Sequence, residues 1–369
     1  MKLLFFINSM EGGGAQRVMS IISSEMAERG HDVTLSLNWP GSTYGINPLV
    51  KVISASNLSG NKRRNIVHRL FRYLYNLNST RKHTRNMIRS VKPDVIITFM
   101  FCNMYSVVRY HGNIPIIHSE HNAYDRKNKF EQFIKRFYIN RLYNKVFVLT
   151  SFDYGFSRAK GLKNTFIMPN PNTFKCISIE EYDHTYQSRK NILVCGRVNQ
   201  WYVKGFDIAI RAFSLVANKY PCVDLDIAGE GSTEAIANLC KIAEKYGVQE
   251  RIHFLGQRDD IESVMQYHQI FLLSSRTEGF PMVVTEAMSH GTPCVSFEKL
   301  SSSIIVDGID GTLVKDGDIN ELASALRDML NDNLLRYKMG KTAITNVSRF
   351  SVKKIGDRWE NALVALCKE

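Results

Sequence analysis

The sequence predicts an α/β protein of two Rossmann-like domains that face each other across a cleft. Short runs of aliphatic, β-branched and aromatic residues alternate with helix-length segments throughout the 369 residues. These runs are continuously apolar, which is typical of strands in a parallel sheet that helices cover on both faces. The alternation restarts after a polar passage with two prolines that begins at MPNPN, residues 168–172. A chain of this length is expected to form two domains.

The expected strands follow one another at the spacing of β-α units. In the first half they are residues 3–8, 32–37, 51–55, 94–100, 114–119, 145–150 and 165–170. In the second half they are residues 191–196, 223–229, 251–256, 270–275, 292–297 and 311–315. The expected domains are residues 1–172 and 173–350, with a last helix in 351–369 that packs back on the first domain. In open α/β sheets ligands bind beyond the carboxyl ends of the strands, so the segments after these strands are the candidate sites.

The charge is unevenly distributed along the chain. Residues 1–170 hold 25 Lys and Arg against 9 Asp and Glu, whereas residues 171–369 hold 23 against 26. Between residues 33 and 93 there are eleven basic residues and no acidic one. This asymmetry predicts a polyanionic partner of the first half, either a membrane surface or a nucleic acid.

Residues 61–89 interleave cations with apolar residues at helical spacing. One interpretation is a surface helix whose apolar stripe packs on the sheet. The other, which the missing acidic residues favour, is a helix that lies on anionic lipid. A nucleic-acid-binding protein is the alternative, but the sequence contains no recognisable reading motif. The cations expected at the membrane or acceptor are Arg63, Arg64, Arg69 and Arg72.

The ends of the chain and its cysteines predict a cytosolic protein. The apolar start KLLFFIN has only seven residues before polar ones follow, which is too short for a signal peptide. No apolar run reaches the roughly 18 residues of a membrane span. The seven cysteines form no CxxC pair, so we expect reduced thiols and no structural zinc.

The segment EGFPMVVTEAMSHGTP, residues 278–293, carries two carboxylates in an apolar context. Pro281 suits the first turn of a helix, and the closing Gly-Thr-Pro stops it. Glu278 is then in the preceding loop, and Glu286 is about a turn and a half inside the helix. Two carboxylates so placed can bind opposite ends of one ligand. The alternative is that Glu278 complements the helix dipole and Glu286 is solvated.

Two cations follow the strand at residues 191–196. Arg197 offers a planar fork for phosphate oxygens and Lys204 a point charge, a combination that suits a diphosphate. The first free N–H groups of the later helix, at Met282 and Val283, are expected to join them. Glu286 would then accept hydrogen bonds from a ribose diol. Glu278 would accept them from the hydroxyls of a sugar, so the ligand predicted is a nucleotide-sugar.

A glycine-rich loop, NSMEGGGAQRV, follows the first strand. Gly12, Gly13 and Gly14 let the backbone approach a ligand because no Cβ stands in the way. The loop is not a GxGxxG fingerprint, and no acidic residue closes the next strand to bind a ribose. By itself the loop is as consistent with a plain turn as with a site.

These motifs together resemble glycosyltransferase family 4, whose members are retaining nucleotide-sugar glycosyltransferases of the GT-B fold. The resemblance covers nearly the whole chain. The motifs that carry it are GGGAQRV, HSEHN (118–122), MPNPN, GRV…KGF, IAGEG (227–231), FLGQRDD (254–260) and the segment in which seven residues separate Glu278 from Glu286.

The resemblance implies roles for individual residues. Arg197 and Lys204 would stabilise the departing diphosphate, which is an electrostatic task. Glu286 would bind ribose, and Glu278 with the backbone of Gly279 and Phe280 would hold the donor sugar. The remaining assignments are His121 approaching the transferred sugar through a carbonyl or hydroxyl contact, Gly13 and Gly14 closing over the donor, and Gln257 and Arg258 contacting the base.

The resemblance also implies the reaction. We expect retaining transfer of a hexose or N-acetylhexosamine from a nucleotide-sugar, with a UDP-sugar favoured, to a glycan acceptor. The first domain would bind the acceptor and the second the donor, without a metal or cofactor. The acceptor is expected to be linked to polyprenyl diphosphate at the inner face of the membrane, in cell-surface polysaccharide or oligosaccharide biosynthesis. A sugar-nucleotide epimerase or a phosphorylase of the same fold is the alternative.

Overall fold

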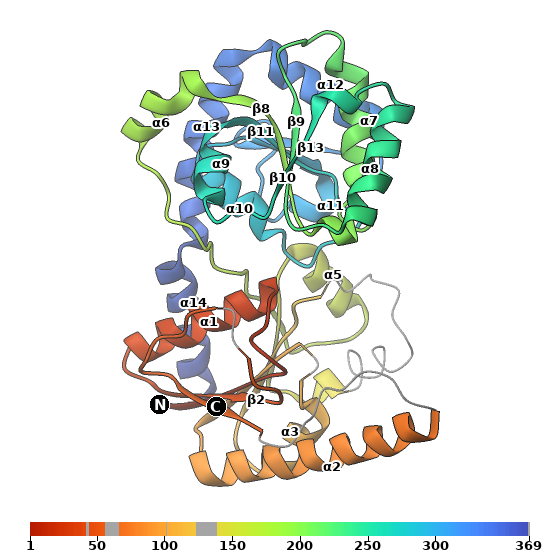
Figure 1. Cartoon of the computed structure of the whole chain (residues 1–369). Coiled ribbons are helices and arrows are strands. Elements are labelled where there is room, and N and C mark those ends of the chain that lie inside the picture. Colours follow the sequence, from red (N-terminus) through yellow and green to blue (C-terminus); the bar gives the residue numbers. More distant parts are fainter. Residues whose placement is uncertain (42–43, 56–65, 101, 123–138, 368–369) are drawn as a thin grey trace. The chain divides into compact units, whose positions relative to one another are not determined.

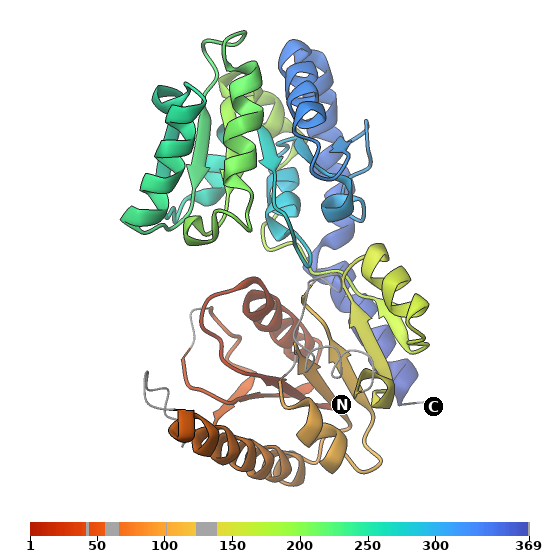
Figure 2. The ribbon, with the colours of Figure 1, turned by 90° about the vertical axis from the view of Figure 1, so that its right-hand side faces the viewer.

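A computed structural model describes residues 1–41, 44–55, 66–100, 102–122 and 139–367, without the side chains of residues 66–77. The chain forms two compact units (Figures 1 and 2). The N-domain comprises Met1–Pro171 together with Val352–Glu369, and the C-domain comprises Asn172–Ser351. The chain therefore passes between the domains at two places, after Pro171 and after Ser351.

The N-domain is built on a seven-stranded sheet in the order β3-β2-β1-β4-β5-β6-β7. All neighbouring strands are parallel. The strands are β1 (Lys2–Ile7), β2 (Asp32–Leu37), β3 (Lys51–Ser54), β4 (Val95–Phe99), β5 (Ile116–Ser119), β6 (Lys145–Val148) and β7 (Thr165–Ile167). Most are fully buried, as their apolar sequences predict. β3 is exposed at all four residues because it is the edge strand.

Helices cover both faces of the N-domain sheet (Figure 1). One face carries α1 (Gly14–Glu28) and the C-terminal helix α14 (Val352–Leu366), and the other carries α2 (Ile66–Val91) and α3 (Met104–Tyr110). The α14 helix buries Trp359, whose ring lies against Phe99 at 6.1 Å and edge-on to Phe147 at 4.9 Å between centroids. The last helix is thus part of the N-domain core. The shorter α5 (Ser151–Ala159) packs against β7.

The C-domain repeats the same plan with six parallel strands in the order β10-β9-β8-β11-β12-β13. Its strands are β8 (Lys190–Cys195), β9 (Leu225–Ala228), β10 (Ile252–Gly256), β11 (His268–Leu273), β12 (Cys294–Phe297) and β13 (Gly311–Val314). All thirteen strands predicted from the sequence are therefore found. The strand order reverses between β1 and β4 in one domain and between β8 and β11 in the other, and open α/β sheets bind ligands at such switch points.

The helices of the C-domain also form two layers. On one side, α7 contacts α8 and α12, and on the other α10 contacts α9 and α13 (Figure 1). No helix within the described residues is long and apolar enough to cross a membrane. The helices are α6 (Ile179–Thr185), α7 (Phe206–Ala217), α8 (Thr233–Lys245), α9 (Ile261–Tyr267), α10 (Met282–Ser289), α11 (Glu298–Ser301), α12 (Ile319–Asn331) and α13 (Asn333–Val347).

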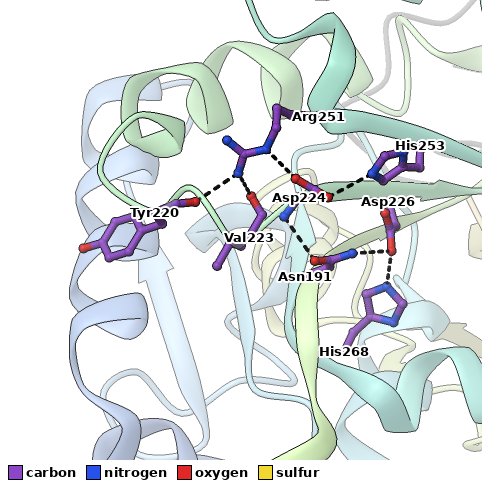
Figure 3. A network of polar contacts seen from close by, with 8 residues as sticks. All are labelled: Asn191, Tyr220, Val223, Asp224, Asp226, Arg251, His253 and His268. Atoms are coloured by element: carbon purple, nitrogen blue, oxygen red, sulfur yellow. Dashed lines mark hydrogen bonds and ion pairs between the residues drawn. The ribbon is translucent and has the colours of Figure 1, made fainter.

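Polar side chains tie together the amino ends of four C-domain strands (Figure 3). Asp226 accepts hydrogen bonds from His268 at 2.8 Å and from Asn191 at 3.1 Å. Asp224 accepts from Arg251 and from His253, the latter at 3.0 Å. Its backbone N–H donates to the Asn191 side chain at 3.1 Å. We call these five side chains and Asn191 the amino-edge network.

Candidate active site

The loops that follow β8 and β11 meet at the C-domain switch point, because these two strands are neighbours in the sheet. Gly205 precedes α7 with a φ of +65°, and a Cβ there would lie 1.8 Å from the Ser274 carbonyl oxygen. The Ser274 hydroxyl donates to the Gly205 carbonyl at 2.8 Å. The glycine of the KGF motif is therefore required for the close approach of the two loops.

An ion pair joins the two loops across this contact. The Lys204 Nζ donates to Glu278 Oε1 at 2.8 Å, and the Ser275 hydroxyl donates to the same oxygen at 2.7 Å. Both side chains are largely buried, with 23% and 14% of their surfaces exposed. Sequence reasoning assigned Lys204 to the diphosphate and Glu278 to the sugar, and the structure places both at one point.

Arg276 is a further link between the loops that sequence reasoning missed. Its guanidinium makes a two-pronged contact with the Asp207 carboxylate, at 2.7 Å for each pair of atoms. The guanidinium also lies 3.9 Å from the centroid of the Tyr202 ring. The backbone N–H of Arg276 donates to the Val203 carbonyl at 2.8 Å. The only signal in the sequence was a cation two residues before Glu278. Arg276 fixes the loop that carries Lys204 against the loop that carries Glu278.

The end of β8 approaches the end of β9 as closely as two backbones allow. A Cβ at Gly229, where φ is +141°, would lie 1.9 Å from the Gly196 carbonyl oxygen. The Gly196 N–H donates to the Ala228 carbonyl at 3.0 Å. Arg197 follows directly and is exposed at the carboxyl end of β8. The structure therefore positions Arg197 at the same edge of the sheet as Lys204.

The helix α10 begins one residue later than the sequence suggested. Pro281 is its N-cap and Met282 its first residue. The Met282 N–H donates to the Phe280 carbonyl at 2.9 Å, so the prediction that this amide is free for a ligand is wrong. The tight turn formed by Pro281 is the reason. Val283 lies in the first turn of α10.

Glu286 lies inside α10 and is only 5% exposed. The alternative that it is a solvated surface residue is therefore wrong. Its Oε1 accepts a hydrogen bond from the Thr173 hydroxyl. Burial, together with the nearby Glu286 charge, raises the pKa of the Cys195 thiol at the end of β8. The structure thus places a buried carboxylate beside the carboxyl end of β8.

The two residues expected to contact the nucleotide base lie on a different loop from Lys204 and Glu278. Gln257 and Arg258 are exposed after β10, which β9 separates from β8 in the sheet. The Arg258 guanidinium binds both oxygens of Asp260, at 2.7 and 2.6 Å.

Phe280, expected with Gly279 at the donor sugar, is buried, and its ring meets the Phe350 ring edge-on at 5.6 Å between centroids.

His121 lies in the N-domain just after β5. Its ring stacks on Phe99 at 4.6 Å between centroids, and its Nε2 is 3.0 Å from the Ser119 hydroxyl. Burial lowers the pKa of His121 to about 3, against a smaller opposing effect of Glu120. The ring is therefore neutral at physiological pH. A neutral ring suits a hydrogen-bonding contact with a sugar better than proton transfer.

The glycine-rich loop lies at the N-domain switch point, between β1 and α1. Gly12 and Gly13 have φ of +35° and +150°, and the Gly13 N–H donates to the Tyr44 hydroxyl at 3.1 Å. Gly14 is the first residue of α1. The φ of Gly12 lies in the left-handed region that favours glycine, and the φ of Gly13 lies near the limit of that region.

Three asparagines form a cluster beside this loop that sequence reasoning missed. The Asn38 amide donates at 2.8 Å to the side chains of both Asn8 and Asn103. Asn103 is buried with a left-handed φ of +53°. Each asparagine follows a strand, β2, β1 and β4 respectively, which was the available signal. Strained residues of this kind gather at functional sites.

The cations expected at a membrane fall mostly outside the described part of the chain. Arg63 and Arg64 lie outside the described residues, and Arg69 and Arg72 lie in α2 without described side chains. Further along α2, Thr84, Met87 and Ile88 are buried against the N-domain. The opposite side of this part of α2 exposes Arg81, Lys82, Arg85 and Arg89.

Comparison with known families matches both halves of the chain to glycosyltransferases. Residues 12–154 match the model described as Glycosyltransferase Family 4, and residues 189–332 match the model described as Glycosyl transferases group 1. An uncharacterised glycosyltransferase of Haemophilus influenzae is 24% identical over 98% of this chain and 99% of its own length. The amylovoran biosynthesis glycosyltransferase AmsD of Erwinia amylovora is 26% identical over the same shares of the two chains.

Solved structures show the same fold. HepE of Anabaena, solved in complex with UDP, superposes with a TM-score of 0.76 at 18% identity over 99% of this chain and 100% of its own. HepE in complex with UDP-glucose superposes with a TM-score of 0.75. The two parallel-sheet domains are those of the GT-B fold, and with the two family matches they show that the chain is a GT-B glycosyltransferase.

Proposed function

We propose that the protein is a retaining family 4 glycosyltransferase that transfers a hexose or N-acetylhexosamine from a nucleotide-sugar to a glycan acceptor. The observation that carries the proposal is the assembly of Lys204, Glu278 and Glu286 at the C-domain switch point. Lys204 provides positive charge for a diphosphate. Glu286 provides a buried acceptor for a ribose diol, and Glu278 one for sugar hydroxyls. A UDP-sugar is the favoured donor, since HepE has been solved with UDP and with UDP-glucose.

In this proposal Lys204 exchanges its contact with Glu278 for the donor diphosphate. Arg197, exposed at the end of β8, adds a second cation. As the bond between the sugar C1 and the diphosphate oxygen breaks, negative charge grows on the leaving group and these cations stabilise it. The acceptor oxygen bonds to C1 on the same face, which retains the configuration. Its proton passes to the leaving phosphate oxygen.

The remaining predicted contacts complete the proposed donor site. The backbone at Gly279 and Phe280 and the N–H of Val283 approach the sugar and phosphates. Neutral His121 contacts the transferred sugar, and the glycine loop at Gly13 and Gly14 closes over the donor. The base meets Gln257 and Arg258, and Arg258 would exchange Asp260 for it. The scheme uses no metal ion or cofactor.

We further propose a lipid-linked acceptor, a glycan on polyprenyl diphosphate at the inner face of the cytoplasmic membrane. The exposed cations of α2 and the absence of acidic residues from 33 to 93 support a peripheral contact with anionic lipid. AmsD, named for amylovoran biosynthesis, supports a role in making cell-surface polysaccharide. The N-domain would bind this acceptor, and we expect no nucleic-acid partner.

Nucleotide release from UDP- and GDP-sugars tests the enzyme, with and without anionic vesicles that carry a polyprenyl-diphosphate glycan. We expect release from one donor, stimulated by the acceptor vesicles, and an anomeric configuration that is retained in the product by NMR. Glu278→Gln should reduce the rate about 100-fold, because a charged hydrogen bond to the donor is lost. Glu244→Gln, at an exposed position on α8, is the matched control.

The outcomes separate the alternatives. Conversion of the donor without any acceptor would identify an epimerase instead. A product of inverted configuration would contradict the retaining mechanism, and full activity of Glu278→Gln would remove Glu278 from the site.

A further inference from the structure

The segment that enters the C-domain from the N-domain runs along α10. The Thr173 hydroxyl donates to Glu286 Oε1. One residue further, the Phe174 ring meets the His290 ring edge-on at 5.7 Å between centroids. The Ile177 N–H then donates to the Ser289 carbonyl at 3.0 Å. The first residues after the domain boundary are thus attached to the helix that carries Glu286.

The segment that leaves the C-domain is attached to the same region. The Phe350 carbonyl accepts the Asn172 N–H at 2.7 Å, so the two connections between the domains are hydrogen-bonded to each other. The Phe350 ring packs on Phe280, two residues after Glu278. Both connections between the domains therefore contact residues 278–293, the segment that carries Glu278 and Glu286. One connection contacts it near Glu286 and the other near Glu278.

Thr173 is well suited to hold the Glu286 carboxylate in one orientation. A buried carboxylate needs hydrogen-bond donors, and a donor to an ionised oxygen forms a strong bond. The β-branched threonine has few side-chain rotamers, which limits the positions of its hydroxyl. The preceding Asn172 is only 4% exposed, and its amide donates to the Phe174 carbonyl at 2.9 Å. The segment that presents Thr173 is itself fixed.

We infer that Thr173 is a positioning residue that orients Glu286 for the ribose of the donor nucleotide. Through this contact, donor binding is coupled to the segment that connects the two domains. The inference rests on the proposed function, in which Glu286 binds the ribose. A carboxylate has two oxygens and about four acceptor positions. The hydroxyl of Thr173 takes one of these positions.

Calorimetric titration with UDP tests this inference on the full-length protein, with GDP titrated in parallel. Thr173→Val keeps the shape of the side chain and removes the hydroxyl, and we expect it to weaken nucleotide binding about ten-fold. Thr173→Ser keeps the hydroxyl and should restore binding to within about two-fold. Thr345→Val is the matched control, since Thr345 is exposed on α13 and its hydroxyl donates within the helix to the Lys341 carbonyl.

Steady-state kinetics supply a readout that a purely structural role would not change. Contact with the ribose is made in both the ground state and the transition state, so its loss raises the donor KM and leaves kcat nearly unchanged. Thr173→Val should therefore raise KM about ten-fold and Thr173→Ser should not. A variant that is only less stable would lose active protein, which lowers kcat and leaves KM unchanged.

Hydrogen exchange tests the coupling in the wild-type protein. UDP should slow amide exchange in residues 172–177, and the effect should be smaller in Thr173→Val. If neither UDP nor GDP binds the wild-type protein, the proposed function fails. If nucleotide binds but exchange in residues 172–177 is unchanged and Thr173→Val binds as tightly as the wild type, the donor site stands and the role of Thr173 is overturned.

Discussion

The C-domain sheet carries clusters of charged residues at both ends of its strands. At the amino ends, Asp224 and Asp226 bind Arg251, His253 and His268 (Figure 3). At the carboxyl ends, two glutamates are close to Lys204 and Thr173. The first cluster is formed almost entirely by residues on the strands or within two residues of them. The second cluster comes from two loops, the interior of α10 and the segment that connects the domains.

This difference indicates which cluster can serve a ligand. The backbones of Asp226 on β9 and His268 on β11 are held by the register of one sheet, in which only β8 separates the two strands. Lys204 and Glu278 lie on loops, and their contact can be replaced by one to a charged ligand. Similar residue types therefore stabilise the fold at one edge and provide a binding site at the other.

The largest effect on stability is expected at the amino edge. Asp226→Ala removes one partner of a pair in which both residues are less than 10% exposed. Removing one partner of a buried pair costs about 3–5 kcal/mol, because the other partner stays buried without it. We expect the free energy of unfolding to fall by that amount. Urea denaturation measures it, with the exposed Asp328→Ala as control. Because the carboxyl edge is untouched, the protein that remains folded should bind UDP normally. Weakened binding would contradict the separation of the two edges.

Two glycines with the same φ test the packing of the carboxyl edge. Gly205 and Gly256 both have φ of +65°, but a Cβ at Gly205 would clash with the Ser274 carbonyl, whereas none of the described atoms lies within 4 Å of a Cβ at Gly256. Gly256→Ala should cost about 1–2 kcal/mol, the strain of a left-handed residue. Gly205→Ala should cost about 2 kcal/mol more and also weaken nucleotide binding, because the loops of Lys204 and Glu278 must separate. Equal effects on unfolding would show that the loops adapt.

The smallest effect extends the comparison to the N-domain, whose carboxyl edge carries the partly buried His121. Burial lowers its pKa from 6.5 to about 3, so the unfolded chain binds a proton that the folded protein does not. The contribution to stability is present above pH 6.5 and is lost as the pH falls towards 3, by up to about 1.4 kcal/mol per pH unit. Urea denaturation between pH 7 and 4 should show a shallower pH dependence for His121→Leu than for the wild type. Identical slopes would mean that His121 is accessible to solvent and readily protonated.

Local pattern was enough to predict the strands and several parts of the site. A buried parallel strand requires a continuous apolar run, and each of the thirteen runs in this chain forms a strand, although the edge strand β3 is exposed. Glycines at loop positions such as Gly205 marked close approaches of the backbone. Glu278 and Lys204 were recognised because charged residues directly after a buried strand or before an apolar helix are unusual. Their mutual ion pair was not predicted, because it depends on β8 and β11 being neighbours.

The sequence by itself determined the fold class, the two repeats and the residue types available at the carboxyl ends of the strands, because these depend on periodicity and composition over a few residues. Only the tertiary structure decided which of these residues meet. It joined Thr173 to Glu286 across 113 positions of the chain and Arg276 to Asp207 across 69. It also placed Arg258 two strands from β8. Contacts of this kind follow from strand order and the path of the connections, which no local pattern records.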